Sequence, residues 1–159
     1  KKWRLARAKT IQEKEKSVES KRDTAKKEWA DSQVRWDYTE KDKRRGQAKL
    51  AEAALSYMRN GPRVTGIAGL KGFQGAALHP MEFREQVKRA FGVHLTKKEL
   101  GAMVHDIDLD KSGTIDGAEF LCHFFKLGRE TESEITESAR FQRRREGILK
   151  EIEDQKEDE

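Results

Sequence analysis

The stretch Asp108-Leu-Asp-Lys-Ser-Gly-Thr-Ile-Asp-Gly-Ala-Glu119 decides how this chain is interpreted, because oxygen-bearing side chains stand at every second position from residue 108 to residue 116. Gly113 follows the third of them, where the chain has to turn sharply and a Cβ atom would oppose the turn. Ca²⁺ is a hard cation that takes six to eight oxygen ligands in a flexible shell. The stretch therefore predicts a single Ca²⁺ site, with Mg²⁺ as a competitor.

Each predicted ligand follows from its position in this loop. The side chains of Asp108, Asp110 and Ser112 supply the first oxygens, and Thr114 supplies its backbone carbonyl. Asp116 binds directly or through a water, and Glu119 closes the shell with both carboxylate oxygens. The predicted metal ligands are Asp108, Asp110, Ser112, Thr114, Asp116 and Glu119.

Helical signals surround the loop on both sides. Pro80 suits a first helical turn, and Gly92 is expected to end that helix. Thr96 and Glu99 form a capping box that opens the next helix. The loop is followed by an apolar helical face, which we expect to end near Gly128 and to bury the single cysteine. The residues of this face are Phe120, Leu121, Phe124 and Phe125, and the cysteine among them is Cys122.

The run from Thr96 to Leu127 resembles an EF-hand of the calmodulin-like superfamily. The resemblance implies a sister hand just upstream, with its loop at Lys71–Glu82 and with Leu78 placed to pair with Ile115. The sister loop has Lys71, Phe73 and Gly75 where oxygen ligands are needed, so it is expected to be a structural partner that binds no metal. The implied EF-hand pair covers residues 64–128.

The chain before this pair is strongly charged. Residues 1–45 contain no Gly and no Pro and hold 16 Lys and Arg against 9 Asp and Glu, which predicts one long basic helix. A short helix over 47–58 completes a coiled-coil-like arm over residues 1–60, and a further short helix is expected at 65–73. An interrupted apolar stripe along the arm predicts that it lies on a partner, with Trp29 or Trp36 able to fill a groove of the hand.

Residues 129–159 form the third predicted part. They carry 7 Lys and Arg against 11 Asp and Glu, and a weak apolar stripe predicts a charged helix followed by an acidic, solvated tail.

Several classes of function lack support. Cys122 is the only cysteine and the four histidines are scattered, so neither a disulfide nor a zinc site is expected. No apolar run approaches the length of a membrane span. A basic arm can contact nucleic acid, but no nucleic-acid-binding motif accompanies it. No catalytic constellation is visible, and we predict that the chain is not an enzyme.

The sequence thus predicts an all-α fold, an EF-hand pair flanked by long charged helices. Similarity to proteins of ciliary axonemes and other cytoskeletal assemblies suggests a structural or regulatory component that contacts tubulin or microtubules through the basic N-terminal helix. The implied location is cytoplasmic, on the cytoskeleton or in the axoneme of a cilium or flagellum. Two alternatives are a soluble Ca²⁺ sensor that binds a target helix when loaded, and an EF-hand regulatory segment of a larger enzyme.

Overall fold

The computed structural model describes residues 2–61, 67–75 and 77–157, and over these ranges the chain is all-α, as predicted. No β-strand is present there, and one antiparallel bridge joins Leu78 to Ile115. The described helices are six in number: α1 Lys2–Ser32, α2 Glu40–Asn60, α3 Ile67–Lys71, α4 Pro80–Phe91, α5 Lys97–Ile107 and α6 Gly117–Glu157.

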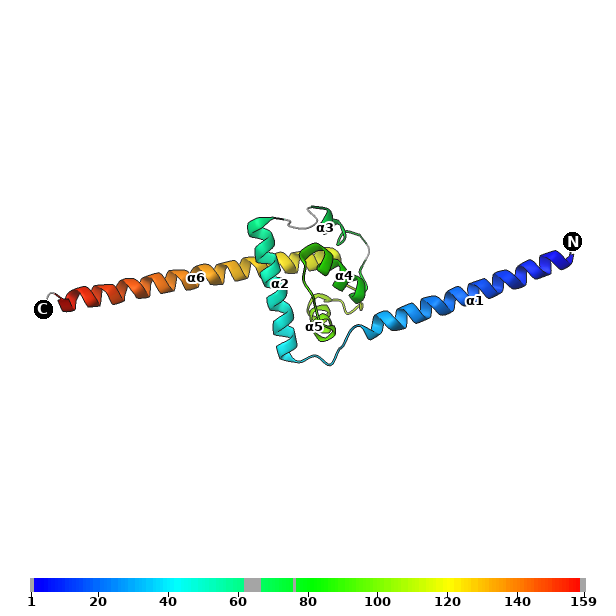
Figure 1. Ribbon diagram of the computed structural model, residues 1–159, viewed down its shortest axis with the longest axis horizontal. Coiled ribbons are helices and arrows are strands. Elements are labelled where there is room, and N and C mark those ends of the chain that lie inside the picture. Colours follow the sequence, from blue (N-terminus) through cyan, green and yellow to red (C-terminus); the bar gives the residue numbers. More distant parts are fainter. Residues whose placement is uncertain (1, 62–66, 76, 158–159) are drawn as a thin grey trace.

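Two long helices extend from a small globular centre in opposite directions (Figure 1). The chain enters along α1, forms the centre with α2 to α5 and the first turns of α6, and leaves along the rest of α6. The two termini therefore lie at opposite ends of the molecule.

An aromatic cluster forms the core of the centre. The rings of Phe83 and Phe120 meet edge to face, with centroids 4.8 Å apart, and those of Phe91 and Phe124 stack at 4.2 Å. Phe73 stands 4.8 Å from Phe120, so the segment before α4 is tied to the start of α6. Aromatic pairs at such separations add to the gain from burying their area.

The helix boundaries predicted around α4 and α5 are confirmed. Pro80 is the first residue of α4, and Gly92 ends it in the left-handed conformation with φ +68°. Thr96 caps α5, accepting a hydrogen bond from the Glu99 backbone N–H. The predicted helix over 65–73 is present as α3, shorter than expected, and residues 65 and 66 lie outside the described ranges.

The prediction of one unbroken helix over residues 1–45 is wrong. The helix ends at Ser32, residues 33–39 form an irregular segment with a turn at residue 33 and a bend at residue 36, and α2 begins after Thr39. Thr39 and Asp42 form a capping box, which starts a new helix by satisfying its first free N–H groups. Val34 is buried and the Arg35 N–H donates to the Lys97 carbonyl at 3.0 Å, so the segment is held against α5.

The helix that follows the loop 108–119 was predicted to end near Gly128. In the structure it continues to Glu157. Gly128 is buried inside α6 because α2 crosses there: a Cβ atom on Gly128 would lie 3.0 Å from the Ala54 Cβ. The glycine thus permits close approach of two helices and is no helix end. Residues 151–157, expected as part of a solvated tail, are the last turns of α6, and the described side chains there are exposed.

Two predicted side-chain placements are also wrong. Trp29 and Trp36 are 57% and 58% exposed, so neither fills a groove of the globular centre. Cys122 points to the outside of α6 and is exposed, although its neighbours Leu121 and Phe124 pack on the core.

Candidate metal centre

The loop from Asp108 to Glu119 connects the end of α5 to the start of α6. Asp108 is the C-cap residue of α5, and its N–H donates to the Val104 carbonyl. The loop then turns through two residues with positive φ, Lys111 at +56° and Gly113 at +78°. The glycine predicted at the sharp turn is therefore required by its backbone conformation.

Three of the predicted ligands gather around the amide of Ser112. Its N–H is 3.0 Å from Oδ1 of Asp108 and 3.0 Å from Oδ1 of Asp110, so the two carboxylates point at one place. The N–H of Gly113 donates to the other oxygen of Asp108 at 2.8 Å. The Ser112 hydroxyl lies 3.3 Å from the Thr114 carbonyl oxygen, which is the fourth predicted ligand atom.

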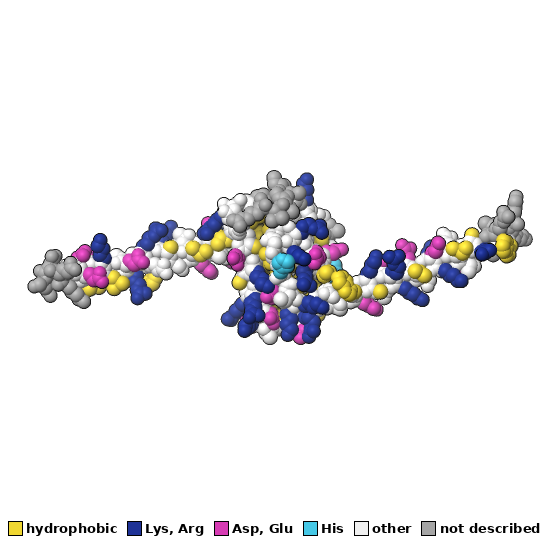
Figure 2. All heavy atoms as spheres, viewed as in Figure 1, with side chains coloured by type: hydrophobic (Ala, Val, Ile, Leu, Met, Phe, Trp, Pro, Cys, Tyr) yellow, Lys and Arg dark blue, Asp and Glu magenta, His cyan; other side chains and the backbone are white. Residues whose placement is uncertain are grey.

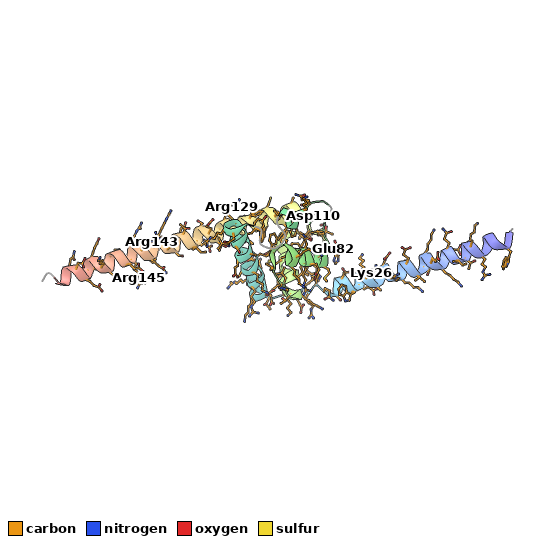
Figure 3. All side chains as sticks on the ribbon, turned by 45° about the horizontal axis from the view of Figure 1, so that its top comes forward. Lys26, Glu82, Asp110, Arg129, Arg143 and Arg145 are labelled. Carbon is orange, nitrogen blue, oxygen red and sulfur yellow. The ribbon has the colours of Figure 1, made fainter. Side chains whose placement is uncertain are left out.

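This arrangement affects the acidity of the loop. A hydrogen bond with the Asp108 carboxyl, followed by those from the Ser112 hydroxyl and amide, holds the pKa of Asp110 below its ordinary value. Hydrogen bonds to the charged form favour that form. Asp110 is labelled in Figure 3, at the surface of the globular centre and near the base of α6.

Asp116 and Glu119 are placed differently. Oδ1 of Asp116 accepts from the N–H groups of Ala118 at 2.8 Å and Glu119 at 3.1 Å, so Asp116 caps the start of α6. Within the described ranges, no three acidic, histidine or cysteine side chains converge closely enough to hold a metal ion. The structure therefore brings Asp108, Asp110, Ser112 and Thr114 together. The Asp116 carboxylate is instead engaged by the backbone at the start of α6, and the exposed Glu119 side chain is not gathered with the other carboxylates.

The residues present fit a hard divalent cation. Every candidate donor is an oxygen, Asp110, Asp116 and Glu119 are exposed while Asp108 is half-buried, and the backbone makes the turn that brings the first donors together. Ile115, in the same loop, is fully buried and exchanges two hydrogen bonds of 2.8 Å with Leu78, as predicted.

The upstream loop at Lys71–Glu82 has a different content. Phe73, at its third position, is buried in the aromatic core and offers no ligand. The Glu82 carboxylate accepts from the His79 N–H at 3.2 Å and so takes part in the capping box of α4. Glu82 is labelled in Figure 3 and lies on the globular centre, as Asp110 does. Residue 76 of this loop lies outside the described ranges.

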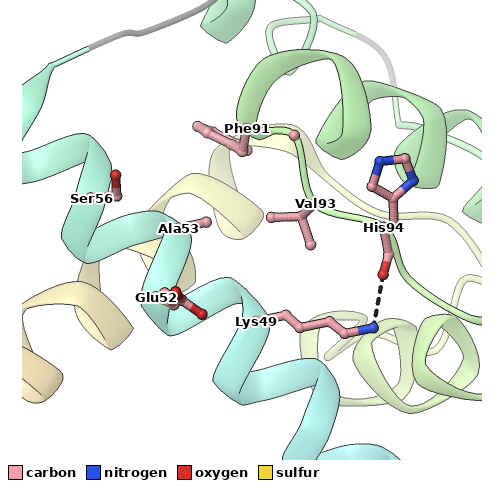
Figure 4. Close-up of a pocket in the computed structure, with 8 residues that line it drawn as sticks. Lys49, Glu52, Ala53, Ser56, Phe91, Val93 and His94 are labelled. Carbon is pink, nitrogen blue, oxygen red and sulfur yellow. Dashed lines mark hydrogen bonds between the residues drawn. The ribbon is translucent and has the colours of Figure 1, made fainter.

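Sequence reasoning missed how α2 is held against the rest of the globular centre. Lys49 on α2 lies 2.7 Å from the buried carboxylate of Glu99, and its ammonium also donates to the His94 carbonyl at 2.9 Å (Figure 4). Lys43 and Gln47 both contact Asp106 at 2.9 Å. Two lysines six residues apart with a glutamine between them are a weak signal in a helical run, because such residues are more often solvated.

The same helix forms one wall of a shallow pocket of about 430 Å³. The pocket is drawn in Figure 4 and lies between α2 and the turn after α4. Its lining residues are Lys49, Glu52, Ala53, Ser56, Phe91, Gly92, Val93 and His94. Lys49 is engaged by Glu99 and by the His94 carbonyl, whereas Glu52, also on α2, is an exposed carboxylate among the lining residues.

No helix in the described part of the chain is long and apolar enough to cross a membrane. Comparison with protein-family models, with curated proteins and with solved structures finds no match to this chain. The function of the site therefore rests on its own residues and geometry.

Proposed function

We propose that this chain is a Ca²⁺-binding EF-hand protein, with one working loop and one degenerate loop, that serves as a structural or regulatory component of a microtubule-based assembly such as a ciliary axoneme. The observation that carries the calcium part is the convergence of Asp108 and Asp110 on the Ser112 amide, in a loop that turns at Gly113. The residues that would hold the ion are Asp108, Asp110, Ser112, Thr114, Asp116 and Glu119.

The pairing of the two loops supports this proposal. The bridge between Leu78 and Ile115 couples the backbones of a loop that offers oxygens and a loop that does not. A degenerate loop can therefore contribute rigidity, while its partner binds the ion. Bound Ca²⁺ would supply the positive charge that offsets four neighbouring carboxylates. The chain's own part is to hold the first two of them, Asp108 and Asp110, close together at the backbone amide of Ser112, with the Gly113 amide also oriented toward Asp108.

The position of α2 favours a structural hand over a sensor. A sensor of this superfamily exposes an apolar groove on loading. Here the apolar side of α2 already lies on α5 and α6, with Leu50 and Ala54 fully buried. Tyr57 adds ring contacts to Phe91 and Phe125 with centroids 5.7 and 5.8 Å apart. An intramolecular helix thus occupies the face that a target helix would use.

The charge of α1 supports a partner with an acidic surface. The side chains of α1 from Arg7 to Trp29 are exposed, and lysines and arginines outnumber acidic residues along it. Microtubules present such a surface, and electrostatic attraction at this range weakens as salt is added.

Calorimetric Ca²⁺ titration, with a hydrophobic dye in a parallel sample, tests the calcium part. We expect one site per chain in the wild type and none in Glu119→Gln. Glu82→Gln is the matched control, because it removes the same charge from the degenerate loop and a glutamine can still complete the capping box. We expect no change in dye signal. Absence of heat in the wild type would contradict the calcium assignment, and a rise in dye signal would favour the sensor alternative.

Co-sedimentation with polymerised tubulin tests the partner. We expect the full chain to pellet with microtubules at low salt and to be released as ionic strength rises. Replacing Lys14, Lys16 and Lys21 with Glu should abolish pelleting, whereas Arg143, Arg144 and Arg145→Glu in α6 removes the same charge and should preserve it. Wild-type protein that stays in the supernatant at low salt would contradict microtubule binding.

A further inference from the structure

Both arms of the molecule expose large apolar side chains along their length. On α1 these include Ile11 and Val18, which are 50% and 57% exposed. On α6 beyond Gly128 they include Phe141 and Ile148, which are 69% and 52% exposed. Figure 2 shows hydrophobic side chains interspersed with charged ones along both arms. Exposed apolar residues repeated along a helix indicate an interaction surface.

The spacing of these residues is the same on the two arms. Ile11 and Val18 are seven residues apart, and so are Phe141 and Ile148. A seven-residue repeat of apolar residues is the spacing that lets two helices pack along a shared seam. When Ile11 is set beside Phe141 in a parallel pair, Val18 falls beside Ile148.

The charges of α1 form three blocks. Residues 2–9 hold four basic and no acidic residues. Residues 13–19 hold three acidic and two basic residues, and residues 21–27 hold four basic residues and one acidic. The order over residues 2–27 is therefore strongly positive, weakly negative and positive, and the end of α1 adds Glu28 and Asp31.

The charges of α6 form the opposite series. Residues 130–137 hold four acidic and no basic residues. Residues 140–145 hold four basic and no acidic residues, and residues 151–157 hold four acidic residues and one basic. The register that aligns Ile11 with Phe141 also sets each block of α1 beside a stretch of α6 dominated by the opposite charge.

We propose that the α1 arm of one copy of this chain pairs with the α6 arm of a second copy. The proposal goes beyond the proposed function and does not depend on Ca²⁺ or on microtubules. The charges identify α6 as the partner of α1. Two α1 arms that overlap over their full length would set the positive block 2–9 against a positive block in either orientation. Two α6 arms would likewise oppose acidic blocks, and like charges on facing helices destabilise the pair. Only α1 with α6 matches every block.

The shape of the molecule sets the direction of pairing. The arms extend from opposite sides of the centre, so α1 and α6 of one chain do not meet (Figure 1). Along the chain, α1 runs toward the centre and α6 runs away from it, and both therefore point the same way. A second copy displaced along the long axis places its α6 parallel to α1 of the first. Such a head-to-tail contact uses two different surfaces and generates an open chain of molecules.

The lengths of the arms agree with this arrangement. α1 has 31 residues, about 46 Å at 1.5 Å per residue. The part of α6 from residue 129 to residue 157 is about 43 Å long by the same rise. Each arm can thus be covered by the other over nearly its whole length. An isolated helix this polar gains little stability from its own sequence, and pairing would supply burial for the apolar seam.

Mass as a function of concentration, measured by analytical ultracentrifugation, tests the pairing. The experiment uses the full chain at low salt, with chelator and without tubulin, so its outcome is separate from that of the proposed function. We expect monomers at the lowest concentration and species larger than two chains at high concentration, with dissociation on adding salt. A mass that stays at one chain throughout would overturn the pairing, and a mass that stops at two chains would overturn the head-to-tail arrangement.

Charge-reversed variants identify the surfaces. Lys21, Arg22 and Lys26→Glu reverses one block of α1, and Glu151, Glu153 and Asp154→Lys reverses the block of α6 that faces it. Each variant alone should remain monomeric, and an equimolar mixture should associate as the wild type does, because each reversed arm then meets its complement. The matched control is Lys41, Arg44 and Arg45→Glu, which makes the same charge change at exposed positions of α2 and should associate normally. Failure of the mixture to associate, or monomeric behaviour of the control, would count against the proposal.

Discussion

Gly101 illustrates at the residue scale how a neighbouring backbone segment leaves no room for any side chain. The segment between α1 and α2 passes over α5, and a Cβ atom on Gly101 would lie 2.1 Å from the Arg35 carbonyl oxygen. Gly117 is under the same constraint, since its Cβ would lie 1.6 Å from the carbonyl oxygen of Phe73. Both contacts are to backbone, which cannot move aside as the end of a side chain can.

Gly101→Ala is therefore expected to destabilise the fold. Overpacking against a fixed neighbour costs about 1–3 kcal/mol. Gly147→Ala is the control, because Gly147 lies in α6 with nothing within 4 Å of its added Cβ, and alanine there should gain up to about 1 kcal/mol of helix propensity. Chemical denaturation measures both. Equal stability of Gly101→Ala and wild type would show that the segment 33–39 does not pack against α5.

Asp37 is expected to stay ionised to unusually low pH. The Arg35 guanidinium holds both of its carboxylate oxygens at 2.9 Å and lowers the pKa of Asp37 to about 2. A carboxyl whose folded pKa is depressed contributes stability above its ordinary pKa near ~4 and loses that contribution as pH falls toward the folded value. NMR titration of the Asp37 carboxyl should therefore show a midpoint near 2 that rises in Arg35→Gln. A smaller rise is expected in Lys98→Gln, because Lys98 lies farther away, at 3.7 Å.

Much of the candidate site could be predicted from residue types and spacing. The turn at Gly113 and the gathering of Asp108 with Asp110 follow from the local pattern, whereas the pairing of Leu78 with Ile115 was implied by the resemblance to an EF-hand. The capping role of Asp116 could not be separated in advance from its role as a ligand, because the same carboxylate suits both. In the structure the Asp116 carboxylate accepts from the backbone N–H groups of Ala118 and Glu119, and these hydrogen bonds hold it in the capping position.

At the scale of the element, α2 is the helix that closes the apolar side of the globular centre. Leu50 is fully buried between α2 and its neighbours, so Leu50→Ala removes packing that cannot be recovered by small shifts. Such a change costs roughly 2–5 kcal/mol. Glu52→Ala, on the exposed side of the same helix, should stay within about 0.5 kcal/mol of wild type. Thermal unfolding distinguishes the two, and an unchanged transition in Leu50→Ala would mean that α2 is not part of the cooperative unit.

The ends of the elements were predicted correctly where a chain-breaking residue marks them, as at Pro80 and Gly92, or where a capping box was recognised, as at Thr96. Gly92 and the Pro80 turn gave α4 its limits, whereas residues 33–39 contain neither Gly nor Pro, and charge alone suggested a continuous helix. The capping signal at Thr39 and Asp42 was the available clue to the break. Gly128 misled in the opposite direction, because its requirement for close packing with Ala54 lies in tertiary structure and has no local signature.

At the scale of the whole molecule, the predicted length is the most direct property to measure. A compact chain of 159 residues has a radius of gyration of about 15 Å. Two arms of about 45 Å on opposite sides of the centre raise that radius well above this value. Small-angle X-ray scattering at low concentration, where single chains dominate, should show the larger radius and an elongated distance distribution. A radius near 15 Å would indicate that the arms fold back onto the centre.

The contact of α2 with Gly128 divides the long final helix into two parts of unequal length. Glu119 and the arm's last residues belong to one continuous helix, and α2 contacts that helix at Gly128, between its two ends. On the loop side the helix is short, about 17 Å, and on the far side it is about 43 Å. A tilt of about 10° about that contact would carry the tip through roughly 8 Å while the loop end moves by roughly 3 Å. For such a tilt, the displacement at the far end of α6 would be more than twice the displacement at the end next to the loop 108–119.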